Sequence, residues 1–234
     1  MALLLSIETS THSFSCALHR NGQLLSYEES VASQTTASLL AVMIEKLFED
    51  AQEKNNNLNG VIVASGPGSY TGLRIGVATA KGICYALNVP LISVETLYLM
   101  AYQFKNSFPS LLERGAGDEV LLCPMRDARR MEVYCALFDN HLNGIELTQA
   151  KIIDEKSFSD KLNHPIYFFG EGSDKCKNII QHPNAKFISD IKPSSKDLGE
   201  IGFQKFQQNH FEDVEHFEPF YLKDFIIKKP NPVF

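Results

Sequence analysis

The spacing of apolar and polar residues predicts that the chain opens with three short strands. Apolar runs at residues 3–8, 13–19 and 24–28 each have the length of a strand. The pair Asn21-Gly22 lies between the second and third runs, and Asn-Gly between two strand-like segments is a strong sign of a β-hairpin. We therefore expect a three-stranded meander at the start of the chain.

Helices and strands then alternate up to residue 105. Residues 36–53 have helical periodicity, and further helices are expected after the glycine-rich stretch that ends at residue 72 and at 95–105. One face of the first of these helices is apolar, and it carries Leu40, Ile44, Leu47, Phe48 and Ala51. Buried strands are predicted at 61–64 and 91–94. This order predicts a mixed sheet that is covered by helices.

The second half of the chain repeats the order of strands followed by helices. Residues 106–118 contain Asn, Ser, Pro and Gly, which is typical of a linker, so we expect two units at 1–105 and 106–234. Strands are predicted at 119–125, 132–138 and 166–169. Ser194 and Ser195 can cap a late helix that runs to about residue 208 and is a candidate to pack back on the first unit.

Composition places the chain among ordinary globular proteins. Its 234 residues are 44% hydrophobic and 21% charged, which excludes a disordered chain, a collagen-like fibre and a disulfide-rich miniprotein. Lys and Arg number 22 and Asp and Glu number 28, so the formal net charge is −6. Proteins that bind nucleic acid alone usually carry a basic excess, because phosphate contacts supply most of the affinity. A stand-alone nucleic-acid binder is therefore disfavoured.

The cysteines and the start of the chain indicate a cytoplasmic protein. The five cysteines are Cys16, Cys84, Cys123, Cys135 and Cys176. An odd number without any CxxC pair argues for reduced, mostly buried thiols. The apolar start is interrupted at Glu8, and no apolar run approaches the ~18 residues that a spanning helix needs. We therefore expect no contact with a membrane.

The glycine-rich stretch at residues 66–76 follows a predicted strand and opens a helix. Backbone amides in such a place can hold an anion. The stretch nevertheless lacks the spacing of the common nucleotide-binding loops. Five residues separate Gly66 from Gly72, Leu73 stands where a Walker loop has Lys, and Thr71 stands where a dinucleotide fingerprint has its third glycine. A tight turn that aims the helix is the favoured interpretation, and phosphate binding is the alternative.

The helix that follows this loop has an unusually wide apolar surface. At 100° per residue its polar arc holds only Arg74, Ala78, Lys81, Tyr85 and Asn88. The remaining arc, roughly 220° wide, is small or apolar, whereas packing on one sheet needs about half of that. The surplus can be covered by a neighbouring helix of this chain, or by a partner subunit that meets this helix and the helix at 36–53.

Other candidate chemistry is sparse. No two of the seven histidines are spaced as a helical metal pair, and no GxSxG nucleophile motif occurs. Glu8 ends the first strand and can hold a cation, but a solvated or hydrogen-bonded strand end is favoured. The charged residues at 126–130 can bind an anion or a partner, although such a turn is more often a solvated hairpin tip.

Several motifs resemble a known family. Residues 5–11 resemble the opening of the actin-like ATPase superfamily, and residues 66–76 with Ala80-Lys81-Gly82 are similar to the signature of the TsaB family. Residues 125–134, 170–172 and 219–223 resemble its later motifs, so the resemblance covers about residues 3–223. Members of the family are bacterial subunits of the machinery that forms threonylcarbamoyladenosine beside the anticodon of tRNA.

The resemblance implies a fold and a role. The fold is α/β, with two actin-like (ribonuclease H-like) lobes, each a mixed sheet covered by helices. The implied role is that of a non-catalytic scaffold that binds and activates the catalytic subunit TsaD and helps to recruit the ATPase TsaE. The chain then needs no cofactor or metal of its own, because ATP and metal belong to the partner subunits. It meets tRNA only through the complex and can form a homodimer through the same surface.

The family contact surface lies on the first two helices of the first lobe. Carried over to this sequence, the partner contacts are Leu39, Val42, Met43, Leu73, Arg74, Val77, Ala80, Lys81 and Cys84. The signature loop comprises Gly66, Pro67, Gly68, Ser69, Tyr70, Thr71 and Gly72. On this expectation, a charge at Val77 or Ala80 blocks association and leaves the fold intact.

Three departures from the family pattern bear on a rival function. Glu8 replaces the usual Asp, Tyr70 stands where Phe is common, and Ala37-Ser38 replaces a His-Ser pair. The rival is a small actin-like ATPase or kinase. It would use Glu8 and Asp127 on magnesium and the glycine loop on phosphate.

Overall fold

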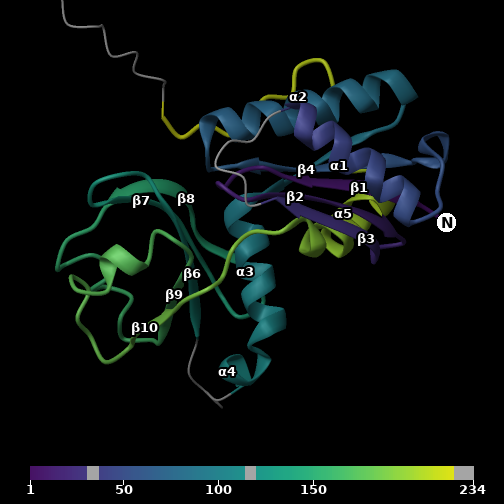
Figure 1. The fold of residues 1–234 in the computed structure, drawn as a ribbon. Coiled ribbons are helices and arrows are strands. Elements are labelled where there is room, and N and C mark those ends of the chain that lie inside the picture. Colours follow the sequence, from purple (N-terminus) through teal and green to yellow (C-terminus); the bar gives the residue numbers. More distant parts are fainter. Residues whose placement is uncertain (31–36, 114–119, 224–234) are drawn as a thin grey trace, which may run out of the picture.

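Two five-stranded sheets organise the part of the chain that the computed structural model describes, which is residues 1–30, 37–113 and 120–223 (Figure 1). The predicted two-lobed α/β fold is confirmed, with a mixed sheet in each lobe. None of the helices in these ranges is long and apolar enough to cross a bilayer. All five cysteines are buried and free, as their number and spacing predict.

The first sheet has the strand order β3-β2-β1-β4-β5. Its strands are β1 (Leu3–Glu8), β2 (Phe14–Arg20), β3 (Gln23–Ser30), β4 (Gly60–Gly66) and β5 (Leu91–Glu95). The predicted meander is confirmed, because β1, β2 and β3 pair antiparallel. Asn21 and Gly22 have φ values of 51° and 84°, the positive pair that a tight hairpin turn requires. The strands β4 and β5 extend the sheet in parallel with β1.

Helices cover both faces of the first sheet. One face is covered by α1 (Ala37–Asp50) and α2 (Tyr70–Leu87), whose buried side chains join one core cluster with β1 and β2 (Figure 1). The opposite face packs against α3 (Thr96–Ser107) and α5 (Leu198–Gln207). The helix predicted at 36–53 is present but ends earlier, and its predicted first residue lies outside the described ranges.

The second sheet has the strand order β10-β9-β6-β7-β8. Its strands are β6 (Leu121–Asp127), β7 (Glu132–Phe138), β8 (Gly144–Ile152), β9 (Ile166–Phe169) and β10 (Ala185–Ile188). Sequence reasoning missed three elements: β8, β10, which has only four residues, and α4 (Pro109–Glu113), which lies in the predicted linker. Short 3-10 turns occur at Asn55–Asn57, Asp174–Cys176 and Ser195–Asp197.

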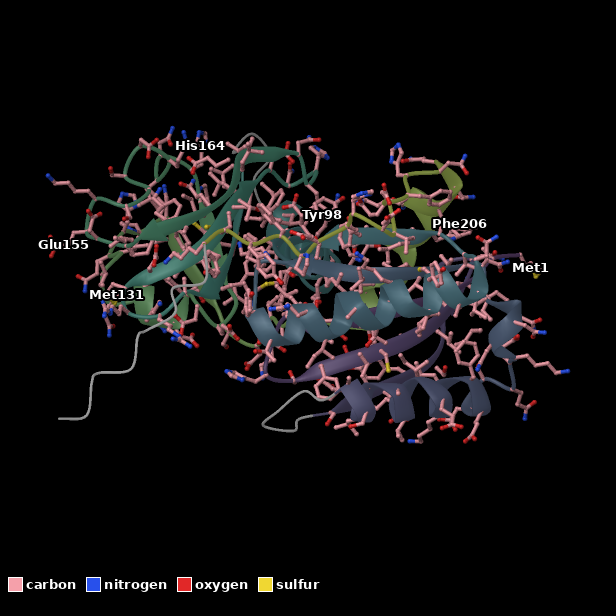
Figure 2. All side chains as sticks on the ribbon, turned by 90° about the horizontal axis from the view of Figure 1, so that it is seen from above. Met1, Tyr98, Met131, Glu155, His164 and Phe206 are labelled. Carbon is pink, nitrogen blue, oxygen red and sulfur yellow. The ribbon has the colours of Figure 1, made fainter. Side chains whose placement is uncertain are left out.

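Two helices connect the lobes through their cores. The rings of Phe104 on α3 and Phe169 on β9 stack with centroids 4.5 Å apart, so α3 belongs to the core of the second sheet as well. The predicted division after residue 105 therefore assigns to the first lobe a helix that both cores share. Figure 2 shows Tyr98 of α3 between the two lobes. Conversely, α5 comes after the second sheet in the sequence but packs on the first sheet.

His19 on β2 attaches the start of α5 to the first sheet. Its ring is fully buried, with Nδ1 3.0 Å from the Ser6 hydroxyl and Nε2 3.1 Å from the carbonyl oxygen of Lys196. Burial lowers the pKa of His19 from 6.5 to about 4, because the charged imidazolium would lose its hydration. The folded chain therefore keeps this ring neutral at pH values where the unfolded chain protonates it.

This difference makes stability depend on pH. Between pH 6.5 and about 4 the unfolded chain binds more protons at His19, so the free energy of unfolding falls as the pH is lowered. We expect His19 to contribute a loss of about 2 kcal/mol between pH 7 and pH 5. Urea unfolding of the wild type and of His19→Gln at both pH values measures it. An equal loss in the variant would show that another group is responsible.

Candidate functional site

The carbonyl oxygen of Ser10 joins three segments of the chain where the two lobes meet. Ser10 follows the end of β1, and its carbonyl accepts a hydrogen bond from the backbone N–H of Ser69 at 2.7 Å. The same oxygen accepts a second hydrogen bond from Nη2 of Arg126 on β6 at 2.5 Å. One atom of the first lobe therefore holds both the glycine loop and the second lobe.

The carboxyl group of Glu8 lies inside this junction. The side chain is fully buried, and its Oε1 accepts a 2.5 Å hydrogen bond from the backbone N–H of Ser10. The other oxygen, Oε2, is buried without a hydrogen-bond partner among the described residues. Burial raises the pKa of Glu8, which favours the uncharged carboxyl group. The prediction that Glu8 is hydrogen-bonded at the end of the strand is confirmed. The alternative prediction, that its carboxyl group is solvated, is wrong.

Arg126 turns inward from the charged segment at 126–130. It is only 4% exposed, and its Nη1 lies 3.3 Å from Oε1 of Glu171. The prediction of a solvated hairpin tip is therefore wrong for Arg126, because its guanidinium spans the junction between the lobes. It holds for Arg129 and Arg130, which are exposed.

The glycine loop is shaped by the close approach of the first lobe's own backbone. The hydroxyl of Ser69 caps α2 by accepting a hydrogen bond from the N–H of Gly72 at 3.2 Å. A Cβ atom on Gly72 would lie 2.1 Å from the carbonyl oxygen of Thr9, and one on Gly76 would lie 2.1 Å from its hydroxyl oxygen. Glycine at these positions lets the turn after β1 rest on α2, which supports the interpretation of a tight turn that aims the helix.

Several groups that the rival function would use already have partners within the chain. Two loop amides, those of Ser69 and Gly72, already donate within the chain. The Glu8 carboxyl is held by a backbone N–H, and Asp127 pairs with Lys175. Among the described residues no group of three or more His, Cys, Asp or Glu side chains is placed to hold a metal ion.

Most of the predicted partner contacts are buried in the chain's own core. The side chains concerned are Met43, Leu73, Val77, Ala80 and Cys84, none more than 6% exposed. Their assignment to a partner surface is wrong, because Met43 on α1 and the other four residues on α2 are buried where these helices pack on the first sheet. Most of the wide apolar arc of α2 is therefore covered within the chain, by the sheet and by α1, while Gly82 and Leu87 on that arc stay exposed.

The other four predicted contacts keep some exposure. Val42 is 60% exposed, Arg74 is exposed, and Leu39 and Lys81 are half-buried. The guanidinium of Arg74 donates to the hydroxyl of Tyr70 at 3.1 Å. A role in partner binding stays a prediction for these residues.

The predicted partner contacts omit three residues that α2 presents to solvent. Ala78 and Gly82 are exposed, and Tyr85 is 87% exposed. The polar arc already contained Ala78 and Tyr85, so the helical placement of residues could have found them. We call Val42, Arg74, Ala78, Gly82 and Tyr85 together the outer helix face.

Comparisons with known proteins agree on one family. A family model described as "TsaD: tRNA N6-adenosine threonylcarbamoyltransferase" matches residues 29–230. The tRNA threonylcarbamoyladenosine biosynthesis protein TsaB of Escherichia coli strain K12 is 27% identical over 238 residues and is matched over 98% of both chains. The TsaB protein of Bacillus subtilis strain 168 is 28% identical over 184 residues, which cover 76% of this chain and 75% of its own.

A solved structure has the same fold. YeaZ from Pseudomonas aeruginosa superposes with a TM-score of 0.78 at 22% sequence identity. The match covers 95% of this chain and 100% of that one. This likeness confirms the two-lobed actin-like fold.

A pair of neighbouring substitutions tests the assignment of buried and exposed sides on α2. Val77→Glu places a carboxylate in the core, and we expect it to lower the free energy of unfolding by about 3 kcal/mol or more. Ala78→Glu points to solvent, so we expect a change within about 0.5 kcal/mol. Urea unfolding followed by circular dichroism measures both. Equal stability of the two variants would contradict the packing described here.

Proposed function

The chain belongs to the tRNA N6-adenosine threonylcarbamoyltransferase family, in its TsaB group, and we propose on this premise that it is a non-catalytic subunit that binds and activates TsaD. It takes part in the biosynthesis of threonylcarbamoyladenosine in tRNA, like the TsaB proteins that it matches over most of their length. In this proposal it works in the cytoplasm and meets tRNA only through the assembled complex.

One observation supports the non-catalytic role: polar groups of the chain itself lie inside the junction between the lobes. An enzyme of the actin-like class needs an open site between its lobes for a nucleotide and a cation. Here the Ser10 carbonyl, the Arg126 guanidinium and the buried Glu8 carboxyl lie together where the lobes meet, which supports a role without a nucleotide in this chain. We therefore assign ATP and metal to the partner subunits and none to this chain.

The outer helix face is the proposed contact surface for TsaD. Ala78 has a small side chain and Gly82 has none, so a partner helix can approach α2 closely. Tyr85 is a large exposed aromatic side chain, the type that most often anchors a protein interface, and Val42 adds apolar area on α1. A second copy of the chain can use the same face, and we propose that the resulting complex with TsaD recruits TsaE.

A charge on this face should prevent the association. We expect Val42→Glu to weaken binding to TsaD at least tenfold, since burying an unpaired carboxylate at an interface is unfavourable. The matched control is Leu147→Glu, which places the same charge at an 88% exposed position on β8 of the other lobe. Calorimetric titration of purified TsaD with each variant measures the affinity.

The same variants connect binding to activity. Transfer of the threonylcarbamoyl group to tRNA by a reconstituted mixture should require the chain, persist with Leu147→Glu and fall with Val42→Glu. Wild-type affinity of Val42→Glu would show that the outer helix face is not the contact surface. Full transfer activity without the chain would contradict the proposed function itself.

A further inference from the structure

The segment that follows α5 lies along the edge of the first sheet without being buried in it. We call residues 211–223 the C-terminal strap. None of its residues is buried, and apart from one isolated bridge residue it has no helix or strand. Its first part reaches β5, the edge strand, where the N–H of Glu212 donates to the carbonyl of Leu91 at 2.8 Å. The hydroxyl of Ser93 donates to the Glu212 carboxylate at 2.5 Å.

One lysine of α2 holds the middle of the strap. The ammonium of Lys81 donates to the carbonyl oxygens of Glu215 and Phe217, at 3.0 and 2.9 Å. These carbonyls belong to a turn that starts at Asp213, whose own carbonyl accepts from the N–H of Phe217 at 2.8 Å. A cation bound to the last carbonyls of a turn stabilises it in the same way as at the end of a helix.

Charge favours this attachment as well. The strap carries four carboxylates, on Glu212, Asp213, Glu215 and Glu218, and one lysine. Lys81 is therefore a positive group of α2 held directly against an acidic segment, so its hydrogen bonds are reinforced by attraction between opposite charges.

The end of the strap closes over the glycine loop. The N–H of Phe220 donates to the carbonyl of Ser65 at 2.8 Å, and Ser65 lies near the end of β4. The ring of Tyr221 packs against that of Tyr70 with centroids 4.9 Å apart. Lys223 then pairs with Glu132 on β7 of the second lobe. The strap thus passes from β5 across α2 and the loop to the other lobe.

Few interactions oppose the local opening of such a segment. Segments with few buried apolar contacts open at a small fraction of the global free energy of unfolding. Two partly buried side chains, Val214 and Phe217, pack on the first core. The ring of Phe211 contacts that of Phe206 on α5, and the ammonium of Lys223 lies over the ring of Tyr134. The other links are the individual hydrogen bonds and side-chain contacts described above. Two of those hydrogen bonds come from the single ammonium of Lys81.

We propose that the C-terminal strap opens and closes as one unit on the folded chain, and that Lys81 is the positioning residue that keeps it closed. Opening exposes the carbonyl of Leu91 at the edge of the sheet and removes the contacts of Phe220 and Tyr221 with the glycine loop. The closed strap protects the β5 edge from pairing with another strand. A partner that touches the strap shifts the balance between the two states.

Hydrogen exchange of the isolated chain tests this proposal without any partner. In Lys81→Met we expect the amides of Glu212 and Phe220, at opposite ends of the strap, to exchange about tenfold faster than in the wild type. The amides of β1 and β4 should keep their protection. The matched control is Lys46→Met, which removes an exposed cation of α1 that pairs with Glu28 on β3, so it should leave the exchange of Glu212 unchanged.

The results separate the possible outcomes. Unchanged exchange at both amides in Lys81→Met would overturn the role of Lys81. Faster exchange at Glu212 alone would show that the strap does not open as a unit. Faster exchange throughout β1 and β4 would show a loss of global stability and would also overturn the proposal. Cleavage by chymotrypsin beside Phe217 should accelerate in parallel with the exchange, since it needs the same opening.

Discussion

The carbonyl oxygen of Ser10 is the contact on which the arrangement of the two lobes depends. It accepts hydrogen bonds from the glycine loop and from Arg126 of the second lobe. Both bonds require the turn after β1 to lie directly on α2, and side chains at Gly72 and Gly76 would collide with Thr9. The small residues of the loop and its helix therefore serve the chain's own backbone. The junction at Ser10 is consequently filled by groups of the chain itself.

Local sequence patterns were sufficient for most of the fold. Apolar runs and the Asn21-Gly22 pair gave the meander, because a hairpin is a contact between neighbours in sequence. Ile166–Phe169 was predicted correctly because its four apolar residues run into a glycine turn. The strand β10, also four residues long, has half-buried and exposed positions and lacks such a run. Its pairing with β9 is a tertiary effect that local spacing does not contain.

The candidate site was harder to predict because its contacts are long-range. Helical periodicity identified the wide apolar arc of α2 but could not tell what covers it. The covering groups include Phe217, which is far away in the sequence and packs on the core cluster that contains Val77 and Cys84. Arg126 belongs to a segment with the composition of a solvated turn, and only the packing of the lobes draws it inward. A contact list taken from a family motif therefore mixed core residues such as Val77 with surface residues such as Val42.

We propose that the junction at Ser10 and Glu8 holds no nucleotide. Titration of the isolated chain with ATP and magnesium, followed by an assay of ATP turnover, tests it most directly. Glu8→Gln is the informative variant, because its amide oxygen can still accept from the N–H of Ser10. We predict no saturable binding or turnover for the wild type or the variant. Saturable turnover by the wild type that Glu8→Gln abolishes would contradict the account and would favour an actin-like ATPase.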